Sequence, residues 1–110
     1  MASSLETEVL QLHAEICAGL ADPTRILILY SLSDGPHNVT EICDALDKPQ
    51  PSISRHLKIL RERGMVTTER QGTTVQYELG DKRLVEALDL LRSVLRDTLE
   101  KRSELIDIIS

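Results

Sequence analysis

The chain has few of the features that mark membrane, secreted or disulfide-rich proteins. Its 110 residues include no Phe and no Trp, so a core must be built from Leu, Ile and Val. The longest apolar run, ILILYSL, falls well short of the roughly 20 residues that a membrane span needs. The first residues, MASSLETEVL, carry acids where a secretory signal needs cations. Two cysteines without such a signal predict reduced thiols in the cytoplasm.

The sequence also lacks the usual signs of an enzyme. It has no Gly-rich phosphate loop, no nucleophile paired with a positioned base and no carboxylate pair in a pocket-like context. It has no internal repeat and no low-complexity linker. Hydrophobic residues make up 41% and charged residues 28%, which is typical of globular proteins. We therefore expect one non-enzymatic globular domain over residues 1–110.

The net charge of -5 is unevenly distributed. Residues 1–49 hold eight acids against two bases, and residues 77–110 hold eight acids against six. Residues 50–76 reverse the sign, with five bases against two acids. An acidic protein with one basic central segment can bind a polyanion locally without binding polyanions indiscriminately.

The first half of the chain predicts four helices. Apolar residues at helical spacing predict one from about residue 3 to 19, and Asp22-Pro23 starts another that ends near residue 32. A capping box of Asn38 and Glu41 opens a short third helix that ends near residue 46. Pro51 suits the first turn of a fourth helix that ends near residue 64. Two helices joined by a short turn predict a helix-turn-helix over 39–64.

After Gly64 the apolar period changes from 3.6 to 2. Alternating residues on either side of Gln71-Gly72 predict a β-hairpin within residues 65–80, which would form a wing beside the helix-turn-helix. A single long helix is expected from about residue 81 to 109. Its leucine stripe is too long for this small core to cover, so a partner subunit is expected, with the first helix packing alongside.

The segment QPSISRHLKIL, residues 50–60, contains the chemistry of a DNA-recognition helix. Ile53, Leu57 and Leu60 fall on one side, and polar side chains crowd the amino-terminal half, where helix N–H groups favour phosphate. Arg, Gln and Ser side chains there can contact base edges in a major groove. A solvated charged helix face is the alternative. The predicted DNA-contacting residues are Gln50, Ser52, Ser54, Arg55, His56, Lys58 and, near the tip of the wing, Arg70.

Four segments together resemble the ArsR/SmtB family of bacterial winged helix-turn-helix repressors. They are ALADPTRILIL (18–28), VTEICDAL (39–46), QPSISRHLKILRERGMV (50–66) and RQGTTVQYEL (70–79). The resemblance runs from about Cys17 to Leu91. It implies a mainly α fold with a β-hairpin wing, and a homodimer joined through its first and last helices, residues 1–20 and 81–110. It also implies binding to double-stranded operator DNA of imperfect twofold symmetry, with release by a metal, metalloid or redox signal.

The sensor sites known in the family are only partly present in this sequence. One metal site of the family uses a Cys-x-Cys pair, but Ala45 stands two residues after Cys43. Another uses Asp and His on the last helix, but residues 81–110 contain no His. Cys17 and Cys43 remain as candidate ligands, with His13 four residues before Cys17. Ordinary packing of Cys43 and a surface position for His13 are the alternatives.

Three functional hypotheses follow. In the first, a repressor without an obligatory cofactor is released when its thiols bind As(III), Sb(III) or a soft divalent metal. In the second, Cys17 and Cys43 form a redox- or sulfide-responsive switch. In the third, the chain is a winged-helix dimerisation module that responds to no ligand.

Overall fold

The structure is a computed structural model that describes residues 2–109. The chain begins with α1 (Ala2–Leu12), which continues into a short π-helical segment, η1 (His13–Cys17). After a turn, α2 (Pro23–Ser31) starts at Pro23, and the Asp22 side chain caps it by accepting a hydrogen bond from the Thr24 N–H at 2.8 Å. The sequence predicted a single helix from about residue 3 to 19. The chain is helical there, but its backbone hydrogen bonds change from the α-helical to the π-helical pattern at His13.

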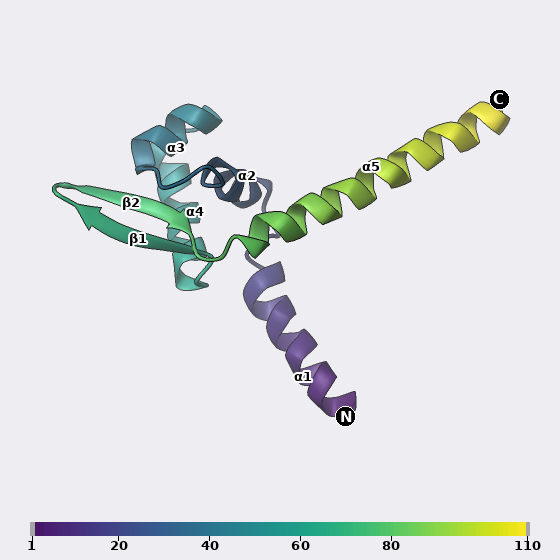
Figure 1. Ribbon diagram of the computed structural model, residues 1–110, viewed down its shortest axis with the longest axis horizontal. Coiled ribbons are helices and arrows are strands. Elements are labelled where there is room, and N and C mark those ends of the chain that lie inside the picture. The colour runs from purple at the N-terminus through teal and green to yellow at the C-terminus, as the bar shows by residue number, and fades with distance from the viewer. Residues whose placement is uncertain (1, 110) are drawn as a thin grey trace.

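Helices α3 (Val39–Leu46) and α4 (Gln50–Glu62) form the predicted helix-turn-helix. The predicted capping box is present. The Asn38 side chain accepts a hydrogen bond from the Glu41 N–H, and the Glu41 side chain accepts one from the Asn38 N–H. Asp47 ends α3 in the left-handed conformation with φ 52°, which turns the chain toward Pro49. Pro51 lies in the first turn of α4, as predicted. This arrangement holds α4 against α2 and α3 (Figure 1).

The wing is an antiparallel hairpin of β1 (Val66–Gln71) and β2 (Thr74–Leu79). Gln71 pairs with Thr74, so the turn has two residues, and Gly72 supplies the positive φ of 64° that it needs. The loop before α3 adds a short bridge to this sheet, because His37 and Tyr77 exchange backbone hydrogen bonds of 2.9 and 2.8 Å. No pattern in the sequence predicted this bridge.

The core lies almost entirely within α2, α3, α4 and the start of the wing, which we call the head. Its buried apolar side chains come from all of these elements, and only one comes from the last helix. They are Ile28, Leu29, Leu32, Ile42, Ile53, Leu57, Leu60, Met65, Val66 and Leu88. As the composition predicts, the core is aliphatic, with Met65 as its one sulfur-containing member.

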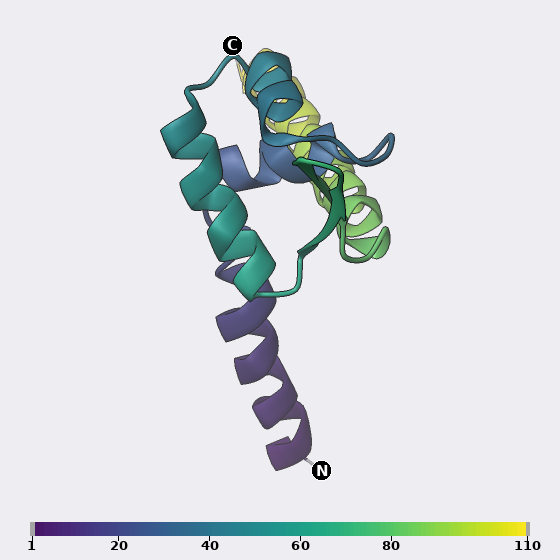
Figure 2. The ribbon, with the colours of Figure 1, turned by 90° about the vertical axis from the view of Figure 1, so that its left-hand side faces the viewer.

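Two helical arms leave the head in different directions (Figures 1 and 2). One is α1 with η1, and the other is α5 (Arg83–Ile109), 27 residues long. Asp81 caps α5 by accepting a hydrogen bond from the Arg83 N–H, and hydrogen bonds from the Arg83 side chain lower the pKa of Asp81 to about 2. No helix within residues 2–109 combines the length and apolar character needed to cross a bilayer.

Candidate nucleic-acid interface

Helix α4 has one apolar side and one polar side. Ile53, Leu57 and Leu60 are at most 1% exposed and pack into the head. At 100° per residue, four exposed polar side chains fall within an arc of about 140° on the other side. These are Gln50, Ser54, Arg55 and Lys58; Ser52 is half-buried at the border. The structure thus brings four of the predicted contact residues to one accessible edge of the helix, with Ser52 beside it.

The amino-terminal turn of α4 can accept an anion. Pro49 precedes the helix in an extended conformation, and no side chain caps the first turn. The backbone N–H groups of Gln50 and Ser52 are therefore available at the positive end of the helix dipole. A phosphate of a nucleic acid backbone is the kind of group that binds there.

His56 does not lie on this polar edge. It is only 7% exposed and shares the inward side of α4 with Ile53 and Leu60, so the prediction that it faces DNA is wrong. Its ring lies 3.3 Å from the Arg25 guanidinium and 3.9 Å from the Asp22 carboxylate. The spacing of three and four residues from the two aliphatics was the signal that could have placed it inside.

The wing carries one further cation near its tip. Arg70 is exposed on β1, where it pairs with Val75 one step before the turn. Because the two strands extend well beyond the head (Figure 1), Arg70 lies where a wing can reach a flanking phosphate.

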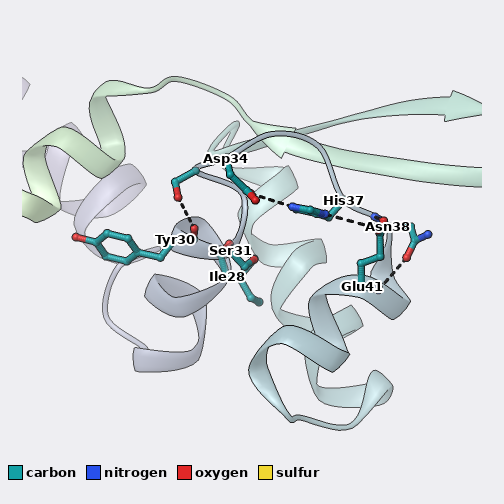
Figure 3. A network of polar contacts seen from close by, with 8 residues as sticks. Ile28, Tyr30, Ser31, Asp34, His37, Asn38 and Glu41 are labelled. Atoms are coloured by element: carbon teal, nitrogen blue, oxygen red, sulfur yellow. Dashed lines mark hydrogen bonds and ion pairs between the residues drawn. The ribbon is translucent and has the colours of Figure 1, made fainter.

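A polar network fixes the loop that joins α2, α3 and the wing (Figure 3). His37 bonds through Nε2 to Asp34 at 2.9 Å, and its Nδ1 lies 3.6 Å from a Glu41 oxygen. The hydrogen bond to Asp34 raises the pKa of His37, and the same bond lowers the pKa of Asp34. His37 therefore links Asp34 to the start of α3 and, through its backbone, to Tyr77.

The candidate sensor residues are not brought together within one chain. Cys17 is exposed on η1 and Cys43 is half-buried on α3, where it packs against the core; both are free thiols. His13 is exposed on η1, four residues before Cys17. Among residues 2–109, no three His, Cys, Asp or Glu side chains are close enough to hold a metal ion.

Comparisons by sequence point to one family. Residues 22–68 match the family described as bacterial regulatory protein, arsR family. The HTH-type transcriptional repressor SmtB of Mycobacterium tuberculosis is 46% identical over 77 residues, which are 70% of this chain and 57% of that protein. This chain thus spans just over half the length of that relative. The uncharacterized HTH-type transcriptional regulator MJ1325 of Methanocaldococcus jannaschii is 43% identical over 79 residues, which are 71% of this chain and 89% of that protein.

Comparison by structure gives the same fold. The homodimeric winged helix-turn-helix DNA-binding domain Mb0332 of Mycobacterium bovis superposes with a TM-score of 0.75 at 26% identity, covering 87% of this chain and 89% of that one. The predicted winged helix-turn-helix fold is confirmed. The relatives are named as transcriptional regulators or repressors, in agreement with the prediction that the chain is not an enzyme. The chain belongs to the ArsR family of bacterial regulatory proteins.

Proposed function

We propose that this protein is a cytoplasmic transcriptional repressor that binds double-stranded operator DNA through α4. The observation that carries the proposal is the polar edge of α4, where Gln50, Ser54 and Arg55 are held outward by three buried aliphatics. Lys58 and Arg70 add positive charge beside it in an otherwise acidic chain. Arg and Gln contact base edges in the major groove, whereas the cations and the helix terminus contact phosphates.

The protein acts as a homodimer whose arms form the interface. Large apolar side chains are exposed along both arms, among them Leu5 at 64%, Leu91 at 61% and Leu95 at 55%. An exposed apolar surface of this length is unfavourable in water, and a second copy of the chain offers a matching one. Twofold symmetry then presents two α4 helices to half-sites about 34–36 Å apart. Operator DNA with imperfect twofold symmetry, which the family resemblance implies, matches such a dimer.

The signal that releases the operator acts on thiols. Cys17 is exposed and Cys43 lies on the helix directly before α4, so a change at either one is close to the DNA-binding edge. Because one chain supplies no three-donor site among residues 2–109, a soft ion such as arsenite requires thiols from both subunits. A redox or sulfide switch requires only that two thiols meet. Either signal lowers operator affinity by its preference for a dimer of different spacing.

The DNA-binding proposal is tested by fluorescence anisotropy of the reduced protein on DNA from upstream of its own gene. We expect Arg55→Ala and Gln50→Ala each to weaken binding by about 1–3 kcal/mol, and Arg70→Ala to reduce the salt dependence. Lys101→Ala, an exposed cation far along α5, is the matched control and should leave affinity unchanged. Affinity that is insensitive to Arg55, Gln50 and salt would leave only a dimerisation module.

The thiol proposal is tested on the same complex with arsenite and then with a thiol oxidant. Release by arsenite that Cys43→Ser or Cys17→Ser abolishes would identify a metalloid sensor. Release by the oxidant alone would identify a redox switch. A complex that withstands both reagents would contradict a thiol signal and leave the operator binding in place.

A further inference from the structure

A polar cluster joins the end of the first arm to the inward side of α4. Arg25, on α2, contacts three groups at once. Its Nε donates to the Gly19 carbonyl at 2.8 Å, its Nη2 donates to the Ala18 carbonyl at 3.2 Å, and its Nη1 lies 3.3 Å from Nδ1 of His56. One guanidinium therefore binds both the segment that follows η1 and the helix that carries the DNA-binding edge.

The donors in this cluster fix the tautomer of His56. A guanidinium has only N–H donors, so Nδ1 of His56 must accept the hydrogen bond from Arg25. The ring proton of the neutral imidazole is then on Nε2, which faces the Asp22 carboxylate at 3.9 Å. Asp22 also caps α2, so the donor and the carboxylate that face the ring both belong to the amino-terminal end of α2. The contact with Arg25 orients the buried ring, and the carboxylate at 3.9 Å lies beyond hydrogen-bond distance on its other side.

A second arginine, Arg63, contacts the same arm from the carboxyl end of α4. Arg63 Nη1 donates to the carbonyls of Ala14 and Glu15, at 2.5 and 3.1 Å. The segment after η1 also packs tightly against the residues that follow α4. A Cβ added to Gly19 would lie 2.4 Å from the sulfur of Met65. Figure 2 shows the carboxyl end of α4 beside the inner end of the first arm. The arm and α4 are thus linked at the middle of the helix, through His56, and at its carboxyl end, through Arg63.

We propose that Arg25 and His56 form a positioning latch that sets the angle of α4 relative to the first arm. The inference rests on the proposed function, because it concerns how the DNA-binding edge is held. His56 acts on DNA through α4 and touches no DNA itself. In a dimer joined through the arms, the latch determines where each α4 lies relative to the twofold axis, and hence the spacing of the two edges.

The latch also supplies a route from the thiol to the operator. Cys17 immediately precedes Ala18 and Gly19, whose carbonyls Arg25 binds. The Ala18 N–H closes the π-helical turn on the His13 carbonyl at 3.0 Å, so a change at Cys17 alters the geometry of the groups that Arg25 holds. Displacing the guanidinium removes the donor from Nδ1 of His56 and frees α4 to move.

The test compares three variants of the full chain by operator affinity, dimerisation and thermal unfolding. His56→Leu removes the acceptor, His56→Asn keeps a side-chain oxygen near the position of Nδ1, and Arg25→Gln removes the guanidinium. We expect His56→Leu and Arg25→Gln each to weaken operator binding about tenfold, within the roughly 5- to 150-fold range of coupling between sites, with the dimer intact. His56→Asn should restore most of the affinity. The double variant should lose no more than either single one.

A second measurement does not depend on the variants being stable. The ¹⁵N spectrum of the wild-type imidazoles should show His56 protonated on Nε2 and unprotonated on Nδ1. A proton on Nδ1, or a folded His56→Leu dimer that binds the operator like wild type, would overturn the latch. If Arg55→Ala also left binding unchanged, the proposed function itself would fail; if Arg55→Ala weakened binding while His56→Leu did not, only the latch would fail.

Discussion

The head and the two arms differ in how far they bury their apolar side chains. In the head, residues 28–66 supply nine of the ten buried hydrophobic side chains. In the arms, among the side chains of residues 4–109 that the structure describes, Leu88 is the one large apolar residue that is buried, while Leu5, Leu91 and Leu95 are all at least 55% exposed. Both regions are helical and rich in leucine, so composition does not distinguish them.

This difference indicates that one chain can bury the core of the head by itself, whereas the apolar surfaces of the arms need a second chain to be buried. The head closes its own core, and capping residues define each of its helices. The arms hold their helical shape but leave their stripes uncovered, which is the condition for pairing with a second copy. The stability of the head should therefore not depend on protein concentration, whereas the stability of the arms should increase with it.

The largest effect is expected from a substitution in the core of the head, which should lower the stability of the fold. Leu57→Ala empties a site that is 1% exposed and should lower the free energy of unfolding by about 2–5 kcal/mol at every protein concentration. Chemical denaturation followed by circular dichroism measures this. Leu95→Ala, at a position that is 55% exposed, is the matched arm variant, and its effect should fall as the protein is diluted. Equal, concentration-independent losses would remove the distinction.

A charge in the arm should separate the subunits. Leu95→Glu places a carboxylate in the proposed interface, where desolvation without a partner costs several kcal/mol, so the dimer dissociation constant should rise at least about 100-fold. Sedimentation velocity over a dilution series measures this. Val75→Glu, on the 36% exposed Val75 of the wing, should leave the dimer unchanged. Dimers that withstand Leu95→Glu would place the interface elsewhere.

The cap of α3 should make a smaller contribution to the head. Asn38→Ala removes one side of the capping box and should cost about 1 kcal/mol of stability. Thr40→Ala, two residues later on an exposed position, should cost almost nothing. Denaturant midpoints of the two variants decide this, and equal midpoints would mean that packing alone sets the start of α3.

The smallest effect is the pH dependence of the loop network. The pKa of His37 is raised, so its contribution to stability is complete below the unfolded value and is lost as pH rises through the folded value. The pKa of Asp34 is lowered, so its contribution is present above its unfolded value and is lost in acid. Wild type should exceed His37→Ala in stability by more at about pH 5.5 than at about pH 8.5. A difference that does not change with pH would show that the charge of His37 has no role.

Much of the fold was predictable from local sequence. Asp22-Pro23, the Asn38 capping box and Gly72 each dictate a local conformation, so helix starts and the hairpin turn were predicted within a residue or two. The leucine stripe of α5 predicted a surface for a partner. Gln50, Ser54 and Arg55 were predicted to face outward because the aliphatics of α4 define its inward side.

The errors share one physical cause, which is contact between residues distant in the chain. His56 is buried because Arg25, 31 residues earlier, supplies a donor that makes its burial tolerable. The backbone of His37 pairs with that of Tyr77 on the wing, and the side chain of Arg63 donates to the carbonyls of Ala14 and Glu15 in the π-helical segment. Polar residues of this kind read as surface residues until their partners are known.

The most direct measurement is selection of duplexes from a random pool by wild type and by Arg55→Ala. If paired arms hold two α4 edges at one helical turn, wild type should enrich an imperfect palindrome with half-sites about 10–10.5 base pairs apart. Arg55→Ala should then lose preference at one symmetry-related pair of positions and keep the rest. A pool without enrichment, or the same motif from both proteins, would contradict recognition through α4.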